Sequence, residues 1–262
     1  MKKMWAALAA LAAAGLLMTG CGGEKKEEAP KAEAVPLLQQ IKDKGQLVLG
    51  TAADFPPYEF IDTSKSEKTV AGIDINLAQR IADKIGVKLV VQDMNFSALL
   101  SSLASKKVDI AISAITPTPE RAEAMDFSEI YMSDENIMII RKSDADKFTK
   151  LEDFYGKNIA AAKSTQQEKL AQDYLKDAKI VSLERFGDAL MELMQNKVDG
   201  VPSQRVVAQQ YLLMNPDLAD SGAYFEGHAS SSAVMVLKRN EDLVALVNEV
   251  IAECKENGDI ER

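Results

Sequence analysis

The sequence predicts an α/β fold built from two similar lobes. Strand-like and helix-like segments alternate from about residue 46, which favours mostly parallel sheets with helices on their faces. The alternation restarts near residue 137. Two segments also echo one another, LASKKVD at 103–109 and LMQNKVD at 193–199. Each contains a helix end, a basic turn and a strand start, so we expect one such lobe in each half of the chain.

The first residues predict an export signal rather than a part of the fold. Two lysines precede an apolar run from Met4 to Met18, which is too short and too rich in alanine for a comfortable membrane span. The next motif, MTGC, resembles the lipobox of bacterial lipoproteins, in which the signal is cut before a cysteine that carries lipid. We therefore expect a signal peptide at 1–20 and a lipid on Cys21. An ordinary secretory signal with a chance cysteine is the alternative.

Composition and charge limit the classes of partner. The chain has 262 residues, 47% of them hydrophobic, which suits one or two domains with a real core. Its formal net charge of −9 falls to −11 when residues 1–20, with two lysines and no acids, are removed. This balance argues against nucleic acid as a partner and against an electrostatic grip on anionic lipid. Residues 21–36 carry many charges and no apolar period, which predicts a solvated tether.

Five segments form the predicted first lobe, beginning with a strand at 46–51. Apolar residues that recur every four positions predict a helix that begins near Ile73 and ends at Gly86. A strand at 87–91 follows, then a helix, then a strand at 108–112. The apolar face of that second helix consists of Phe96, Leu99, Leu100 and Leu103. This order of strands and helices favours a parallel sheet.

The predicted second lobe begins with strands at 137–140 and 157–162. Two helices follow, one marked by Leu170, Tyr174 and Leu175 and the other by Leu190, Leu193 and Met194. Both lie in the same alternating order as the segments of the first half, so the second lobe repeats the α/β architecture.

Two late segments lack neighbours in sequence. They are a strand at 234–237 and a final helix whose apolar face includes Cys254, which we interpret as a core residue. We expect both to complete the first lobe. The chain then crosses between lobes near 131–135 and near 228–232, which assigns 37–132 and 232–262 to lobe 1 and 133–231 to lobe 2.

An arginine stands where a helix start disfavours it. In TPTPERAEAMDFS, Thr118 can cap the helix and Pro119 suits its first position, yet Arg121 falls in the first turn, at the positive end of the helix dipole. A carboxylate or phosphate bound there would explain this cation, because free N–H groups and a guanidinium would meet on it. A solvated Arg121 paired with Glu123 or Asp126 is the alternative.

The second lobe has a counterpart in KSTQQE at 163–168. Thr165 followed three residues later by Glu168 predicts a capping box at a helix start that again follows a strand. In open α/β sheets, ligands bind beyond the carboxyl ends of strands, so two such starts can converge on one anion. Capping alone is the simpler interpretation of Thr165.

Aromatic residues flank a pair of prolines in the segment that follows the first strand. In ADFPPYEF at 53–60, the two prolines predict an extended, stiff segment, with Phe55, Tyr58 and Phe60 beside them. Phe96 lies in a similar loop setting. Such residues serve either as edges of the core or as platforms for a ligand.

The residues show no enzyme motif that stands out. The sequence has no Gly-rich phosphate loop, and its single histidine, His228, argues against a metal site or a Ser-His triad. We therefore expect no cofactor. A pair of carboxylates acting as acid and base stays open, because acids are plentiful.

Together these motifs resemble the extracytoplasmic solute-binding proteins of ATP-driven uptake systems for polar amino acids. The resemblance runs from about Leu37 to Gly258 and rests on LVLGTAADFPPYEF, VAGIDINLAQRIADKIGVKL, SKKVDIAISAITPTPERAEAMDFS and KSTQQE, which occur in the family's order. It implies two α/β lobes joined by two crossing segments that close on a ligand. Such a receptor delivers an amino acid to a membrane permease from outside the cytoplasm, here as a monomer held by its lipid anchor.

The resemblance also implies roles for particular residues. Arg121 would hold the α-carboxylate, with help from Thr165 and Gln166. Thr116 would take the amine, with the Ala114 carbonyl nearby. Phe55 and Phe96 would enclose the ligand side chain.

Three departures from the family pattern bear on the ligand. The family usually has an aspartate for the amine where this chain has Gln204, and an amide cannot neutralise an ammonium group. Many amino-acid binders have Asp where this chain has Ala52, and Asp54 is our candidate replacement as the selector of a cationic group. The family also continues beyond the last helix, whereas this chain stops at Arg262.

Two other classes of function compete with transport. Some dehydratases that act on cyclohexadienyl acids share the scaffold and its arginine, and they would need a proton donor over the ligand. A sensor would need a transmembrane or signalling segment, which the sequence does not contain after the last helix. We expect a receptor and not an enzyme.

Overall fold

The computed structural model describes residues 35–64 and 67–260. The expected signal peptide, the lipidated Cys21 and the tether up to residue 34 lie outside these residues. In the part of the chain that is described, no helix combines the length and the apolar character that a membrane crossing requires.

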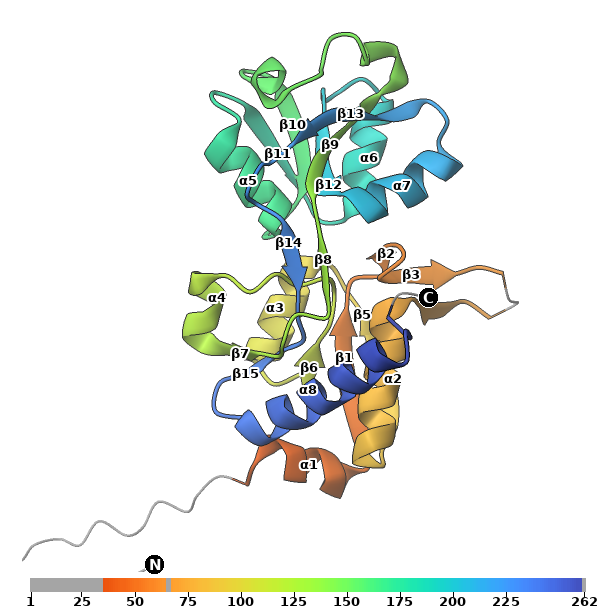
Figure 1. Ribbon diagram of the computed structural model, residues 1–262, viewed down its shortest axis with the longest axis vertical. Helices are drawn as coiled ribbons and strands as arrows, with labels where there is room; N and C mark the ends of the chain where they lie inside the picture. The colour runs from red at the N-terminus through yellow and green to blue at the C-terminus, as the bar shows by residue number, and fades with distance from the viewer. Residues whose placement is uncertain (1–34, 65–66, 261–262) are drawn as a thin grey trace, which may run out of the picture. The chain divides into compact units, whose positions relative to one another are not determined.

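The first lobe is built on a five-stranded sheet (Figure 1). Its strand order is β5 (Lys88–Asp93), β1 (Gln46–Thr51), β6 (Ile110–Ala111), β15 (Met235–Leu237) and β7 (Met125–Phe127). Strand β1 pairs parallel with β5 and β6, whereas β15 pairs antiparallel with β6 and β7. The late strand therefore completes the first lobe, as the sequence predicts.

Helices cover both faces of this sheet. Leu47 and Leu49 of β1 belong to the cluster with α1 (Leu37–Lys44), α2 (Ile73–Ile85) and α8 (Glu241–Glu256). Val48 between them belongs to a second cluster with α3 (Phe96–Ala104). This alternation is the period of two that a strand imposes on a sheet buried on both faces.

A small sheet follows β1 and corrects one expectation. The segment with the two prolines is not extended: β2 (Asp54–Phe55) pairs antiparallel with β3 (Glu59–Asp62), which pairs with β4 (Thr69–Ala71). The chain must reverse between β2 and β3, and the amide of Tyr58 donates a hydrogen bond to the carbonyl of Phe55 at 3.0 Å across this turn. Tyr58 is fully buried, so it is a core residue and not a ligand platform.

The second lobe contains two sheets. One has β9 (Asn136–Arg141) between β12 (Val201–Gln204) and β13 (Leu218–Tyr224), and the other pairs β10 (Asn158–Ala162) with β11 (Lys179–Leu183). The helices are α5 (Gln166–Tyr174), α6 (Phe186–Met194) and α7 (Arg205–Met214), with 3-10 turns η1 (Lys142–Asp144) and η2 (Leu151–Phe154). The strands β11 and β13 and the helix α7 were missed from the sequence.

Strand pairing in this lobe is less parallel than expected. Strands β10 and β11 are parallel, but β9 runs antiparallel to both of its neighbours. The physical reason is that β9 enters directly from the crossing segment without a helix before it. An antiparallel neighbour needs no helical crossover, whereas a parallel one does.

Two strands link the lobes. They are β8 (Met132–Asp134) and β14 (Ser230–Ser232), which pair antiparallel with Ser230 opposite Asp134. Figure 1 shows them side by side between the sheets of the two lobes. Both coincide with the crossings that the sequence predicts.

The echo between the two halves is a structural repeat. Lys106 and Asn196 follow the ends of α3 and α6 and have matching positive φ angles of 60° and 59°. Three residues later, the side chains of Asp109 and Asp199 accept hydrogen bonds from the amides of Val48 (2.7 Å) and Asn158 (2.9 Å), which lie on β1 and β10. Each aspartate thus fixes the same helix-to-strand turn to its own sheet.

Candidate functional site

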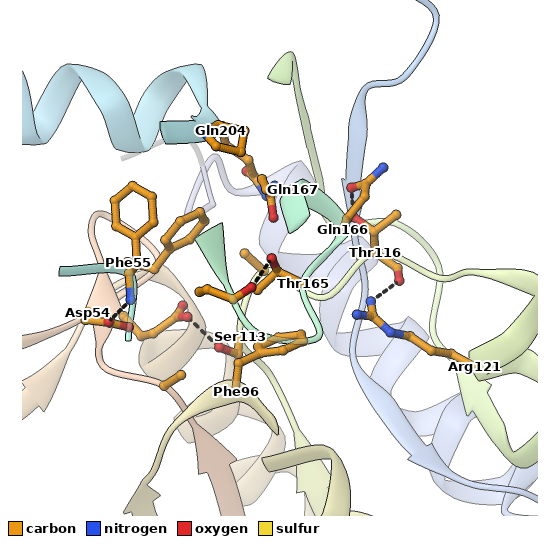
Figure 2. Close-up of a pocket in the computed structure, with 16 residues that line it drawn as sticks. Asp54, Phe55, Phe96, Ser113, Thr116, Arg121, Thr165, Gln166, Gln167 and Gln204 are labelled. Carbon is orange, nitrogen blue, oxygen red and sulfur yellow. Dashed lines mark hydrogen bonds between the residues drawn. The ribbon is translucent and has the colours of Figure 1, made fainter. Parts of the chain in front are cut away.

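A pocket lined by both lobes contains all nine residues that the sequence singles out as ligand contacts. The first lobe contributes Ala52, Asp54, Phe55, Glu59, Phe96, Ser113, Ala114, Thr116 and Arg121. The second lobe contributes Ala162, Thr165, Gln166, Gln167, Phe186, Pro202 and Gln204. Figure 2 shows Asp54 and Arg121 at opposite sides of this pocket with Ser113 between them.

Arg121 points into the pocket from the first turn of α4 (Pro119–Ala124), where the Thr118 hydroxyl caps the helix by accepting from the Arg121 amide at 3.2 Å. Its guanidinium donates to the carbonyls of Thr116 at 2.7 Å and, in the other lobe, Ser164 at 2.9 Å. Burial lowers the pKa of Arg121 to about 10, so the group stays charged at neutral pH.

The competing partner for this arginine is engaged elsewhere. Asp126 lies 2.9 Å from Lys238, and Arg121 forms no ion pair with the residues that the structure describes. The guanidinium carbon instead lies 5.3 Å from the ring centre of Phe96, which holds the side chain by a cation–π contact. The charge of Arg121 is therefore available to an anion in the pocket.

The start of α5 faces the same space, with one difference from the expected capping box. The Thr165 hydroxyl accepts from the amide of Glu168 at 3.1 Å, as predicted. The Glu168 carboxylate, however, accepts from the amide of Ser164 at 2.7 Å and not from that of Thr165. The Thr165 amide is directed to the Ala162 carbonyl at 3.4 Å, which leaves Ser164 as the nearer donor.

Thr116 and Gln166 contact each other across the pocket. The Thr116 hydroxyl donates to Oε1 of Gln166 at 2.7 Å, and Ser230 on β14 donates to the same oxygen at 2.8 Å. These two hydrogen bonds connect the first lobe and a crossing strand to one amide oxygen of the second lobe.

Asp54 has a different partner from the cationic ligand group that we expected. Its Oδ2 accepts hydrogen bonds from the amides of Phe186 (2.7 Å) and Gly187 (3.4 Å), at the start of α6 in the other lobe. A helix start favours a carboxylate, so Asp54 caps α6 across the pocket. Burial raises the pKa of Asp54, and the bond from Gly187 opposes that rise.

Aromatic side chains form the apolar wall. Phe55 and Phe186 meet edge to face with ring centres 5.1 Å apart, and Phe186 lies 5.4 Å from the ring of Tyr211. Phe186 was missed from the sequence because it follows Arg185 at an ordinary helix start. The wall thus contains the two rings predicted in the first lobe, Phe55 and Phe96, and one further ring from the second lobe, Phe186.

Two pocket residues have buried polar atoms without a donor or acceptor from the described residues. Gln204 is 1% exposed and its Oε1 lacks a partner. Glu59 is fully buried, and although its Oε1 accepts from the Ser113 hydroxyl at 2.6 Å, its Oε2 has no N–H or O–H donor. Buried polar atoms are normally satisfied, so each is a place where a ligand or a proton would supply the missing bond.

Glu59 and its neighbour Asp74 carry chemistry that we missed from the sequence. Glu59 stands among aromatic residues in a strand, and Asp74 lies in the first turn of α2, where an acid is ordinary. Both carboxyls are fully buried, and burial is the main cause that raises the pKa of each. The contact joins β3 to α2, and a local reading of the sequence has no signal for it.

Further contacts hold the lobes together around the pocket. Arg185 forms two parallel hydrogen bonds with the Asp93 carboxylate at 2.9 and 3.1 Å, and the Tyr211 hydroxyl donates to the Asp54 carbonyl at 2.9 Å. The lobes are thus in direct contact on two sides of the pocket. In the described ranges, no cluster of three or more His, Cys, Asp or Glu could hold a metal ion.

The chain has clear relatives among known proteins. Residues 47–262 match the family model for bacterial extracellular solute-binding proteins, family 3. The chain is 28% identical to the arginine-binding extracellular protein ArtP of Bacillus subtilis, over 99% of this chain and 96% of that protein.

Two solved structures are similar in fold. One is the amino acid ABC transporter substrate-binding protein AbpA of Streptococcus pneumoniae bound to L-arginine, with a TM-score of 0.83 and 35% identity over 85% of this chain and 94% of that one. The other is the ancestral amino acid-binding protein AncCDT-1, a precursor of cyclohexadienyl dehydratase, with a TM-score of 0.77 and 28% identity over 86% and 96%.

Proposed function

Since this chain belongs to family 3 of the bacterial extracellular solute-binding proteins, we propose that it binds an amino acid between its lobes and delivers it to the permease of an ABC transporter. The observation that carries this function is the charged, partly buried Arg121, which faces the pocket without a carboxylate partner in the part of the chain that is described. A ligand carboxylate would give it that partner, with a strong and directional pair of hydrogen bonds.

The remaining polar groups suit the other half of an amino acid. The α-amine would bind near the Ala114 carbonyl, the Thr116 hydroxyl and Oε1 of Gln204, which needs a donor. The start of α5, with Thr165 and Gln166, would assist Arg121 at the carboxylate. Phe55 and Phe96 would contact the side chain between them.

A basic side chain fits this pocket best. Relatives named for arginine binding support that preference, as does the structure of a similar protein bound to L-arginine. The pocket also contains two carboxyl side chains, those of Asp54 and Glu59, toward which a cationic end would be attracted.

The remaining parts of the proposal concern assembly and location. Lobe 1 would consist of 37–132 and 232–262, lobe 2 of 133–231, and the two crossing strands would act as the hinge on which the lobes close around the ligand. The protein would work as a monomer outside the cytoplasm, held to the membrane by the lipid on Cys21 and the tether.

The test is ligand binding with and without Arg121. L-arginine, added to the purified protein, is expected to raise its melting temperature, and Arg121→Ala is expected to lower the affinity by about 100-fold or more. Removing one partner of a buried charge pair costs about 2–5 kcal/mol in such interfaces. Calorimetric titration measures the affinity, and circular dichroism checks the fold.

The control is Arg80→Ala. Arg80 is 49% exposed and lies 2.9 Å from Asp259 on the surface, so its loss should leave the affinity for arginine unchanged. Arginine binding by Arg121→Ala with unchanged affinity would show that the carboxylate binds elsewhere.

An enzyme of the cyclohexadienyl dehydratase type is the second candidate. The observation that favours it is a buried acid that faces the pocket, because a protonated Glu59 could donate a proton to a ligand there. Consumption of a cyclohexadienyl acid, followed by absorbance of an aromatic product, would establish it. Binding of amino acids without turnover of such acids would support transport.

A further inference from the structure

Glu59 and Asp74 form a buried acid pair behind the pocket wall. Each carboxyl group influences the pKa of the other, and both are fully buried. Two carboxyl groups can share a hydrogen bond only when one of them holds a proton, because an ionised carboxylate only accepts. That proton also accounts for Oε2 of Glu59, which has no N–H or O–H donor among the described residues.

The backbone brings these two acids together. The amide of Asp74 donates to the Tyr58 carbonyl at 2.9 Å, next to Glu59 in the chain. Gly72 makes this approach possible: its φ is +130°, and a Cβ there would lie 2.2 Å from the Tyr58 carbonyl oxygen. On the other side, Ser113 donates to Glu59 and the next amide, that of Ala114, donates to Asp74 at 2.9 Å.

The proton belongs mainly on Glu59. Asp74 accepts two other hydrogen bonds, from the Ala114 amide at 2.9 Å and from the Tyr131 hydroxyl at 2.8 Å, and these favour its ionised form. Glu59 has one such donor, Ser113. The titratable groups that face Glu59 are Asp74 on α2, Asp54 on β2, its neighbour Tyr58, and Tyr131 before β8, and no cation pairs with it in the described residues.

The two carboxyls in the pocket wall differ in the hydrogen bonds that they already accept. Asp54 and Glu59 both line the pocket, but Oδ2 of Asp54 caps α6 through two amides. Glu59 has a proton that it can lose and a single hydrogen-bond donor. A cation that approaches from the pocket would therefore meet Glu59 as the residue whose charge can still change.

We propose that Glu59 receives the cationic end of the ligand side chain and that binding a cation there releases one proton from the Glu59–Asp74 pair. In this step the O–H bond of the shared acid proton breaks, the proton passes to buffer, and the carboxylate left behind pairs with the guanidinium or ammonium group. This inference rests on the proposed function, since it takes the pocket to be the amino-acid site. It adds a selection for positive charge that is coupled to pH.

The pKa of Glu59 sets the direction of the effect. Burial and the adjacent Asp74 hold it well above the usual range of a glutamate. At a pH below the raised pKa, a cationic ligand must displace the proton before it can pair. Its affinity should therefore rise with pH, by up to about tenfold per unit when one whole proton is released. A neutral ligand of the same shape gains nothing from this change.

The experiment compares L-arginine with L-citrulline, its uncharged analogue, by calorimetric titration of the wild-type protein. Titrations in two buffers of different ionisation enthalpy count the protons released. We expect arginine to release a substantial fraction of one proton more than citrulline, because the α-amino and α-carboxyl groups are the same in both. Equal proton release for the two ligands would overturn the proposal without any variant.

Two variants locate the effect. Glu59→Gln should abolish the extra proton release and reduce the preference for arginine over citrulline by about tenfold or more, the loss of a charged hydrogen bond. Arg185→Ala is the matched control: it removes the contact with Asp93 between the lobes, so it should lower the affinity for both ligands alike and keep both the ratio and the proton release. An unchanged ratio in Glu59→Gln, or a ratio lost in Arg185→Ala, would contradict the assignment.

The outcomes also separate this inference from the proposed function. Arginine binding that needs Arg121 but releases no extra proton would remove the inference alone. A wild-type protein that binds no amino acid would remove both.

Discussion

Gln204 lies at the end of β12 with its amide oxygen buried in the pocket wall. That oxygen has no donor among the described residues, and only 1% of the residue is exposed. An ammonium group would satisfy it, although a neutral acceptor offers about half the strength of a charged one. Gln204 can thus accept a hydrogen bond that orients an amine, but it does not supply a negative charge to pair with it.

We expect Gln204→Asp to bind L-arginine about tenfold more tightly than the wild type. The substitution keeps an acceptor near the same position and adds the charge that the ammonium lacks. Titration calorimetry of the two proteins measures the difference, and Gln204→Ala serves as the control that removes the acceptor and should bind less tightly. Weaker binding by Gln204→Asp would mean that the amide is matched to another group.

At the scale of elements, the starts of helices determine how the pocket is closed. The start of α6 presents the amides of Phe186 and Gly187 to Asp54, and Arg185 before them reaches Asp93 at the end of β5. The start of α6 therefore binds two carboxylates from the opposite lobe. Such contacts exist only when the lobes are together, so they stabilise the closed state whatever ligand lies inside.

The Asp93–Arg185 pair should contribute a small, ligand-independent part of the affinity. Both side chains are about one-third exposed, at 30% and 32%. Solvent screening therefore limits the pair to about 1 kcal/mol, or about a fivefold loss of affinity in Arg185→Ala. Titrations of Arg185→Ala, Asp93→Asn and the double variant with arginine and citrulline form the test. A changed preference between the two ligands would contradict this role.

Elements with a local signal could be predicted from the sequence. Helix α2 begins at Ile73 and ends at Ile85, because apolar residues every four positions and Gly86 in a left-handed conformation both act within one helix. Thr118 and Thr165 cap their helices for the same local reason. Where several such signals occur in the family's order, they also place nine residues in one pocket.

Features that depend on distant partners could not be predicted in this way. The sense of β9 follows from how the chain crosses between lobes, and a strand's own residues do not encode that crossing. The partner of Glu59 is Ser113, 54 positions away, and the partner of Asp54 is an amide 132 positions away. The sequence does not show which partner a carboxylate has in the fold. Asp54 was therefore chosen over Glu59 as the residue that selects a cationic ligand group.

At the scale of the whole molecule, the acid pair should make stability depend on pH. The pKa values of Glu59 and Asp74 are raised in the folded protein, so the folded state binds more protons than the unfolded chain. The stabilising contribution is complete below the unfolded pKa values, about 4, and is lost as the pH rises through the folded values.

We therefore expect the ligand-free wild type to lose stability relative to Glu59→Gln as the pH rises from about 5 to 8. Urea unfolding of both proteins at several pH values gives the difference in the free energy of unfolding. Most surface pairs are common to both proteins, so their titration cancels. A difference that stays constant with pH would show that the pair holds no additional proton in the folded state.

The position of β15 has a consequence for how the protein acquires its shape. This strand comes from the last tenth or so of the chain, yet it lies between β6 and β7, both formed by residues before 128. While a ribosome or an export channel releases the chain from its beginning, β7 has no neighbour to join until Met235 emerges. The sheets of the second lobe use only residues 136–224 and can assemble earlier. The middle of this polypeptide is thus able to mature before its beginning, and the sheet of the first lobe is complete only after nearly the whole chain has been released.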